Sequence, residues 1–276
     1  MRRGCTLRRM SRALRIWLVW VGLVVSGCGC PKLFEAPPMP TGGPDAPTLL
    51  SQMRAHADRV QSLELVTRMD YFAEAGQARK GTVEVLARRP ASVRFEVIDP
   101  AGANTMAILM SDGTRFASHE RGQATCYVGD ACASNIARLL PLPFKADELF
   151  DIFAGGAPLL APSQSTASWD DCKGAWRVVQ ERQDGVIHRL WIRPDTGAAI
   201  ESTMHRGETL LYRLTWDDYE LADGVPVARK LHYEAPEGSV DLSMSIREAF
   251  LNSVDSDQPF VVGCPSGTTQ RELQCR

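Results

Sequence analysis

The chain has 276 residues, of which 44% are hydrophobic and 23% charged, a balance typical of globular proteins. Residues 1–27 hold six of the 31 basic residues and none of the 33 acidic ones, so without them 25 basic residues face 33 acidic ones and the formal charge is −8. This acidic balance excludes the basic surface that nucleic-acid binding requires, and only a lipid would draw the chain to an anionic membrane.

Residues 1–27 have the parts of an export signal. Arginines come first, an apolar run follows from Ile16 to Val25, and small residues lead to Cys28. An apolar run of about ten residues is too short to span a bilayer comfortably, which favours a signal peptide over a transmembrane anchor. A plain signal peptide cut beyond Cys30 is the other alternative.

The sequence Val25-Ser26-Gly27-Cys28 resembles the lipobox of bacterial lipoproteins, in which the cysteine becomes the acylated first residue of the mature chain. The resemblance implies that Cys28 carries acyl chains such as palmitate and anchors the protein in a membrane. Gly29 stands where an aspartate would favour retention in the inner membrane. The implied location is therefore the outer membrane, with the domain facing the periplasm.

Disulfides are expected, because an exported chain meets an oxidising compartment. Six cysteines remain beyond Cys5 and Cys28, and they permit 15 connectivities. The local pairs Cys126 with Cys132 and Cys264 with Cys275 are the first expectation. No Cys-x-x-Cys pair occurs and the five histidines are scattered, so neither a metal site nor a cofactor is predicted.

Two segments precede the first predicted strand. Residues 28–47 include six prolines and predict an extended tether between the lipid and the folded domain. Residues 48–61 repeat apolar side chains near helical spacing and predict one amphipathic helix, with Thr48 as its N-cap.

From Leu63 onward the apolar period is 2, and turn signals separate short runs, as in an antiparallel meander with one apolar face. Two short helices, over 134–140 and 145–153, interrupt the strands and are expected to form a lid or plug. The pattern predicts a mainly β protein with α (α+β). Its core is a strongly curved antiparallel sheet or unclosed β-barrel of about 11 strands, with helices on the concave side. Two halves of a sandwich are the alternative.

The apolar face of this sheet either forms a filled core or lines a cavity. Flexible methionines and large aromatic residues in the inward register suit irregular apolar ligands, although they also fill cores. The residues predicted to line the cavity are Val83, Val85, Val93, Phe95, Val97, Met106, Ile108, Met110, Trp176, Met204, Tyr212, Trp216, Tyr233 and Met244.

Enzyme motifs are missing from the sequence. It contains no Gly-x-Ser-x-Gly elbow, no His-Glu-x-x-His, no phosphate-binding Gly-x-x-x-x-Gly-Lys and no Gly-x-Gly-x-x-Gly. His188 and His205 lie on predicted strands and are expected to be ordinary surface histidines. The sequence therefore predicts a protein without catalytic residues; a hydrolase would need a nucleophile and a base that converge in a cleft.

The order of helix, strands, paired helices and further strands behind a lipobox resembles the LolA/LolB group of outer-membrane lipoprotein carriers and receptors. The resembling segments are Arg89–Gly102, Leu109–Phe116, Gly224–Pro226 and Val240–Ile246 continuing to Asn252. The resemblance covers residues 48–252 and implies a half-barrel with a hydrophobic cavity for acyl chains. It departs from the receptor at the turn 100–104, which is small and polar instead of apolar, and the cysteine-containing tail 253–276 lies outside the pattern.

Together these features predict a non-enzymatic outer-membrane lipoprotein that binds lipid or acyl chains for lipoprotein or lipid localisation or envelope assembly. The expected partners are an acyl chain or lipoprotein cargo, the membrane through the N-terminal lipid, and envelope proteins; nucleic acid is not among them. The alternative is a periplasmic interaction scaffold with a filled core and no ligand.

Overall fold

The computed structural model describes residues 38–72, 78–99, 101–102, 104–162 and 164–275. The predicted signal peptide 1–27, Cys28 and the tether up to residue 37 lie outside these ranges, so the predictions for them remain predictions. No helix in the described ranges is both long enough and apolar enough to cross a bilayer.

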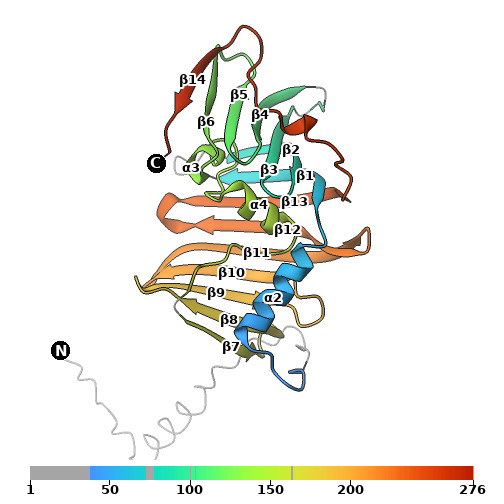
Figure 1. The fold of residues 1–276 in the computed structure, drawn as a ribbon, viewed down its shortest axis with the longest axis vertical. Coiled ribbons are helices and arrows are strands. Elements are labelled where there is room, and N and C mark those ends of the chain that lie inside the picture. The colour runs from blue at the N-terminus through green and yellow to red at the C-terminus, as the bar shows by residue number, and fades with distance from the viewer. Residues whose placement is uncertain (1–37, 73–77, 100, 103, 163, 276) are drawn as a thin grey trace, which may run out of the picture.

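Most of the described chain folds into one sheet of 14 strands. The strands are β1 (Ser62–Phe72), β2 (Ala78–Arg88), β3 (Ser92–Ile98), β4 (Thr105–Ser111), β5 (Arg115–Glu120), β6 (Thr125–Asp130), β7 (Gln164–Asp170), β8 (Ala175–Glu181), β9 (Val186–Ile192), β10 (Ala199–Arg206), β11 (Thr209–Ala222), β12 (Val225–Ala235), β13 (Val240–Leu251) and β14 (Thr269–Leu273). Their spatial order is β14-β6-β5-β4-β3-β2-β1-β13-β12-β11-β10-β9-β8-β7, and the sheet is curved and unclosed (Figure 1). Only β14 and β6 pair in parallel.

The predicted mainly β fold with an unclosed curved sheet is confirmed, whereas the number of strands is 14 instead of about 11. The sheet is continuous, so the sandwich alternative is wrong. The extra strands include β14 at the sheet edge, whose side chains are almost all exposed. An edge strand that buries neither face has no alternating pattern for the sequence to reveal.

The chain crosses the sheet between its two edges. Strands β1 to β6 lie side by side in chain order, as do β7 to β13, and β1 joins the two halves by pairing with both β2 and β13. Residues 131–162 therefore run from β6 to β7 at the opposite edge. They carry α3 (Ala133–Ile136) and α4 (Ala146–Phe153), and α4 lies over the sheet in Figure 1. This connection covers the concave face.

The first helix, α2 (Ala46–Ala57), begins two residues earlier than predicted and ends four residues earlier. Its N-cap is Asp45, whose Oδ1 accepts a hydrogen bond from the Thr48 backbone N–H at 2.9 Å. The prediction of Thr48 as the cap is therefore wrong, because the aspartate three residues earlier satisfies a free N–H of the first turn. The apolar side of α2 packs against β7 and β8.

The hydrophobic core lies between the concave face and these helices. In α4, Leu149, Phe150, Ile152 and Phe153 are all buried, and the Phe153 ring lies 6.4 Å from that of Phe95 on β3. Burial of a large apolar side chain stabilises the fold by about 1.5–3 kcal/mol. The apolar face of α4 therefore holds this short helix on the sheet.

The C-terminal tail belongs to the same structure. A 3₁₀ turn, η2 (Gln258–Phe260), contacts β3, and β14 extends the sheet beyond β6. Arg94 alternates with the concave-facing Val93 and Phe95, and its Nη1 donates to the Pro259 carbonyl at 3.0 Å. The tail therefore crosses the convex face of the sheet.

Four of the cysteines form disulfides, but not in the pairs expected from their spacing. Cys126 bonds to Cys264 and Cys132 bonds to Cys275, so the local pairing is wrong. The reason is geometric. A disulfide spans at most about 7 Å between Cα atoms, and a strand rises about 3.3 Å per residue. Strand β6 therefore holds Cys126 and Cys132 too far apart for a disulfide, and β14 does the same for Cys264 and Cys275. Both bonds attach the tail to the region of β6 and α3. Cys172 is disulfide-bonded as well.

Candidate functional site

The concave face carries most of the residues predicted to line a cavity. Nine of them are buried in the core, and two more, Val97 and Met204, are partly buried against it. The nine are Val83, Val85, Val93, Phe95, Trp176, Tyr212, Trp216, Tyr233 and Met244. The strands therefore place these side chains on one surface beneath the helices.

The register predicted for three residues of β4 is wrong. Met106 is 44% exposed and Ile108 and Met110 are half-buried, whereas the alternate residues of the strand, Ala107 and Leu109, are buried. Nearly every side chain of this strand is apolar, so its alternation does not show which face points inward. These three residues lie on the convex side.

A segment of the crossing connection fills the space above the concave face. We define the plug as residues 139–156, the loop before α4 together with α4 and its C-terminal glycines. Leu140, Leu142 and Phe144 of the loop are buried, and prolines occupy the two positions between them. Proline has no N–H, so the loop cannot join the sheet as a regular strand.

The backbone of the plug loop makes local hydrogen bonds. The Leu142 N–H donates to the Leu140 carbonyl at 2.7 Å, and the Phe144 N–H donates to the Leu142 carbonyl at 2.8 Å, as in successive γ-turns. The Phe144 ring packs edge-on against Tyr212 at 5.4 Å and Tyr233 at 5.7 Å between centroids. Side chains of the protein itself thus occupy the volume that a ligand would need.

Polar contacts hold α4 at defined points. Trp216 Nε1 donates to the Ile152 carbonyl at 2.8 Å, and the Ala199 N–H donates to the Gly155 carbonyl at 2.9 Å. Figure 1 shows the corresponding strands, β10 and β11, on the far side of the sheet centre from β3. Two separate parts of the sheet therefore fix one short helix.

Arg89, in the turn between β2 and β3, connects both covering helices. Its Nη2 lies 2.9 Å from Asp151 Oδ1 on α4 and 3.3 Å from Asp58 Oδ1 at the end of α2. The guanidinium also stacks over the Phe150 ring, 4.5 Å from its centroid. Burial raises the pKa of Asp151, and the charge of Arg89 opposes this shift. The charge of Arg89 thus favours the ionised form of Asp151 beside the core.

A row of polar side chains interrupts the apolar concave face. His188 on β9 lies between Gln180 on β8 and Ser202 on β10, and all three are buried. The distances are 3.3 Å from His188 Nδ1 to Gln180 Oε1 and 2.8 Å from His188 Nε2 to Ser202 Oγ. The expectation of a surface histidine at position 188 is therefore wrong. Only the inward register that His188 shares with Leu190 on β9 could have indicated the burial.

This row does not form a nucleophile and base pair. Burial lowers the pKa of His188 to about 3, so its imidazole is a poor proton acceptor at neutral pH. The third member, Gln180, is uncharged and cannot stabilise an imidazolium as the carboxylate of a hydrolase triad does. The contact between Ser202 and His188 therefore provides hydrogen bonding, not catalysis.

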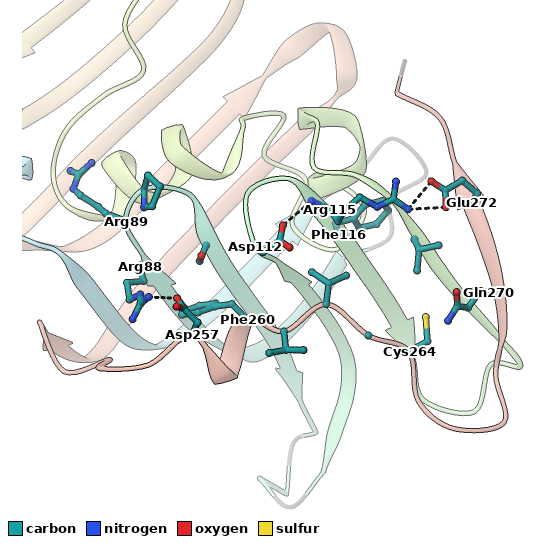
Figure 2. Close-up of a pocket in the computed structure, with 16 residues that line it drawn as sticks. Arg88, Arg89, Asp112, Arg115, Phe116, Asp257, Phe260, Cys264, Gln270 and Glu272 are labelled. Carbon is teal, nitrogen blue, oxygen red and sulfur yellow. Dashed lines mark hydrogen bonds and ion pairs between the residues drawn. The ribbon is translucent and has the colours of Figure 1, made fainter.

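A second hollow lies between the tail and the strands β2 to β6 (Figure 2). This groove has a volume of about 870 Å³. Its lining combines Phe116 and Phe260 with ion pairs, because Arg88 pairs with Asp257 and Arg115 lies 2.9 Å from Glu272. Four charged side chains of the groove are thus already paired within the protein. In the described ranges, no three His, Cys, Asp or Glu side chains gather so that they could hold a metal ion.

No protein-family model and no curated protein matches the sequence. Among solved structures, a DUF1329 family protein from Desulfovibrio piger superposes with a TM-score of 0.55 at 12% identity, covering 77% of this chain and 94% of that one. The LolA superfamily protein NE2245 from Nitrosomonas europaea gives a TM-score of 0.52 at 9% identity, covering 79% and 98%.

A third structure, a Vibrio parahaemolyticus domain assigned to outer membrane lipoprotein-sorting proteins, gives 0.51 at 11% identity, covering 77% of this chain and 95% of that domain. Likeness at these identities shows the fold alone. The resemblance to the LolA/LolB group, predicted from the sequence, is confirmed at the level of the fold, which is similar to that of a LolA superfamily protein.

Proposed function

We propose that this protein is a non-enzymatic outer-membrane lipoprotein that binds lipid or acyl chains between its sheet and the plug. One observation carries the proposal. Three apolar side chains, Leu140, Leu142 and Phe144, enter the concave face from a loop whose backbone bonds are local. Such a loop can leave the sheet without breaking a strand ladder, and an acyl chain can take its place.

The free energies of burial favour the replacement of the plug loop by long acyl chains. Burying the three side chains contributes about 1.5–3 kcal/mol each, and an acyl chain regains about 0.8 kcal/mol per buried methylene. A chain therefore needs on the order of eight methylenes to offset the exposure of the plug loop. Chains of the length found in membrane lipids exceed this threshold, whereas short fatty acids do not reach it.

The proposal includes a role in lipoprotein or lipid localisation or in envelope assembly. The fold supports this role because two structural neighbours are called a LolA superfamily protein and an outer membrane lipoprotein-sorting domain. The cargo is an acyl chain or a lipoprotein, and further envelope proteins are expected partners. The protein reaches the membrane through the lipid predicted on Cys28, with the tether 28–47 as spacer.

Lipid binding is tested on residues 29–276, which include every described element. The protein is exported under an ordinary signal sequence, purified without detergent and extracted for mass spectrometry of bound lipids. It is then titrated with fluorescent acyl probes of eight and sixteen carbons. We expect co-purified lipid and binding of the longer probe only. Protein that is free of lipid and ignores both probes would contradict the proposal.

Lipidation is a separate test on the full chain. Metabolic labelling with an alkyne analogue of palmitate should label the wild-type protein at Cys28, and the C28A variant should carry no label. The C30A variant is the matched control, because it changes a neighbouring cysteine and should keep the label. Labelling that persists in C28A would place the acyl group elsewhere.

The alternative is a periplasmic interaction scaffold, and the filled core favours it because the concave face is covered by the plug. On this hypothesis the plug is permanent and partners dock on the outside, for example at the groove beside the tail. The probe titration separates the two functions: a scaffold binds no acyl chain of any length, but it yields crosslinks to envelope proteins through the groove.

A further inference from the structure

The inference concerns the polar row of the concave face and rests on the proposed binding of acyl chains. Next to Ser202 in the row, Tyr212 on β11 is also buried, and its hydroxyl makes no hydrogen bond of normal geometry within the described structure, although Ser202 lies near enough to influence it. A buried donor without a partner is rare and calls for an explanation, because it loses its hydrogen bonds to water on folding.

The hydrogen bonds between Gln180, His188 and Ser202 determine which of these groups donate and which accept. The pKa of His188 is lowered to about 3 by burial, so the imidazole is neutral and carries one N–H. When Nδ1–H donates to Gln180 Oε1, Nε2 accepts the Ser202 hydroxyl proton. The Ser202 proton is then used inside the row, so Ser202 can only accept from Tyr212, and the phenol O–H of Tyr212 is the donor that a ligand acceptor can take over.

The surroundings of Tyr212 select a neutral acceptor. Burial raises the pKa of Tyr212, Ser202 opposes this shift, and the nearby charge of Glu148 strengthens it. The side chains of the row itself are uncharged. A carboxylate would enter this environment without a cation to pair with and with the negative Glu148 nearby, which is unfavourable in a buried site.

The plug loop covers the Tyr212 hydroxyl. The Phe144 ring lies edge-on to both Tyr212 and Tyr233, whose ring centroids are 6.0 Å apart, so the departure of Phe144 uncovers Tyr212. The vacated positions of Leu140, Leu142 and Phe144 form an apolar path that ends at the buried phenol of Tyr212. An acyl chain in this path would bring its polar end to Tyr212.

We propose that Tyr212 donates a hydrogen bond to the ester carbonyl of a neutral acyl ester whose chain replaces Phe144, with Gln180, His188 and Ser202 holding the site in place. The ligand class is a glycerol ester or another esterified acyl chain, not a free fatty acid. The polar row thus acts as the recognition element of an otherwise apolar binding surface.

The experiment compares two lipids that differ at one group. Residues 29–276 are titrated with 1-monooleoylglycerol and with the corresponding oleyl glycerol ether, which lacks the carbonyl, by displacement of the sixteen-carbon probe. We expect the wild-type protein to prefer the ester by roughly tenfold, the size of one buried hydrogen bond. The Y212F variant should lose this preference and still bind the ether as well as the wild-type protein does.

The control variant is Y233F, which removes a phenol hydroxyl from the other tyrosine that contacts Phe144 and should keep the preference. Without lipid, Y212F should melt at a higher temperature than the wild-type protein, because it removes an unpaired buried donor. Equal binding of both lipids by the wild-type protein, or destabilisation by Y212F, would overturn the inference but leave acyl binding intact. Failure to bind either lipid would overturn both proposals.

Discussion

Two segments cover opposite faces of the sheet near β3, and they are held in different ways. The plug, residues 139–156, covers the concave face through apolar side chains, a few hydrogen bonds and the contacts of Arg89. The tail, residues 253–275, covers the convex face and is attached by two disulfides and a parallel strand ladder.

The difference indicates which cover is built to move. Opening the tail requires the breaking of covalent bonds, whereas opening the plug exposes apolar surface that an acyl chain can bury again. Under the proposed function, the concave cover is reversible in a lipid-rich compartment, and the convex cover is fixed in an oxidising one. The following predictions test this division.

A large loss of stability is expected from the double variant C126A/C264A. The bond joins residues 138 apart in sequence, and removal of a disulfide that closes a long loop destabilises a protein by about 2–5 kcal/mol. Chemical denaturation measures this loss, which should leave binding of the sixteen-carbon probe unchanged. Loss of probe binding in a variant that remains folded would mean that the two covers are coupled.

A matched pair of phenylalanines tests the covers directly. Both Phe144 in the plug and Phe260 in the tail are buried, so F144A and F260A should each destabilise the protein by about 3–5 kcal/mol. Only F144A should raise the affinity for acyl probes, because it weakens the competitor that occupies the concave face. An equal change of probe affinity in both variants would contradict a displaceable plug.

The sequence indicated the half-barrel because its strands bury one face. The alternation in Val83, Val85 and Val93 follows the pleat, and two successive helices between strands predicted a cover for the concave side. These features are local, so one sequence is enough to show them. The same reasoning placed most of the core residues on the correct side of the sheet.

What the sequence did not indicate depends on contacts between distant segments. The strand Thr269–Leu273 is polar except for its last residue, and only its pairing with β6 makes it a strand. The disulfide partners lie more than 130 residues apart in the chain. The polar row was invisible because His188 and Ser202 become neighbours only when β9 and β10 pair.

A drop in pH should loosen the concave side before the convex side. The pKa of His188 is about 3 in the folded protein and near 6.5 in the unfolded chain, so its contribution to stability is fully present above pH 6.5 and is lost as the pH falls toward 3. The loss should reach about 2 kcal/mol at pH 5. Hydrogen exchange at pH 5 should show faster opening of the plug, while β14 keeps its protection.

The H188Q variant is the control for this effect. Glutamine keeps a donor and an acceptor but does not titrate, so the pH dependence of stability should decrease by the share of His188. Burial also lowers the pKa of His56 on α2, and His56 still contributes to the pH dependence of stability in this variant. An unchanged pH profile in H188Q would show that His188 is not the group that titrates.

The smallest loss of stability is expected from substitution of the two arginines that pair with the covers, Arg89 with the plug and Arg88 with the tail. R89Q removes the ion pair with Asp151 and the stacking on Phe150, contacts that contribute about 1 kcal/mol at a partly exposed site. R88Q removes the ion pair with Asp257 of the tail and serves as the matched control. Both variants should lose a similar amount of stability in urea. Only R89Q should also bind acyl probes a few-fold more tightly, because Arg89 holds α4 of the plug, whereas the disulfides keep the tail in place when Arg88 is lost.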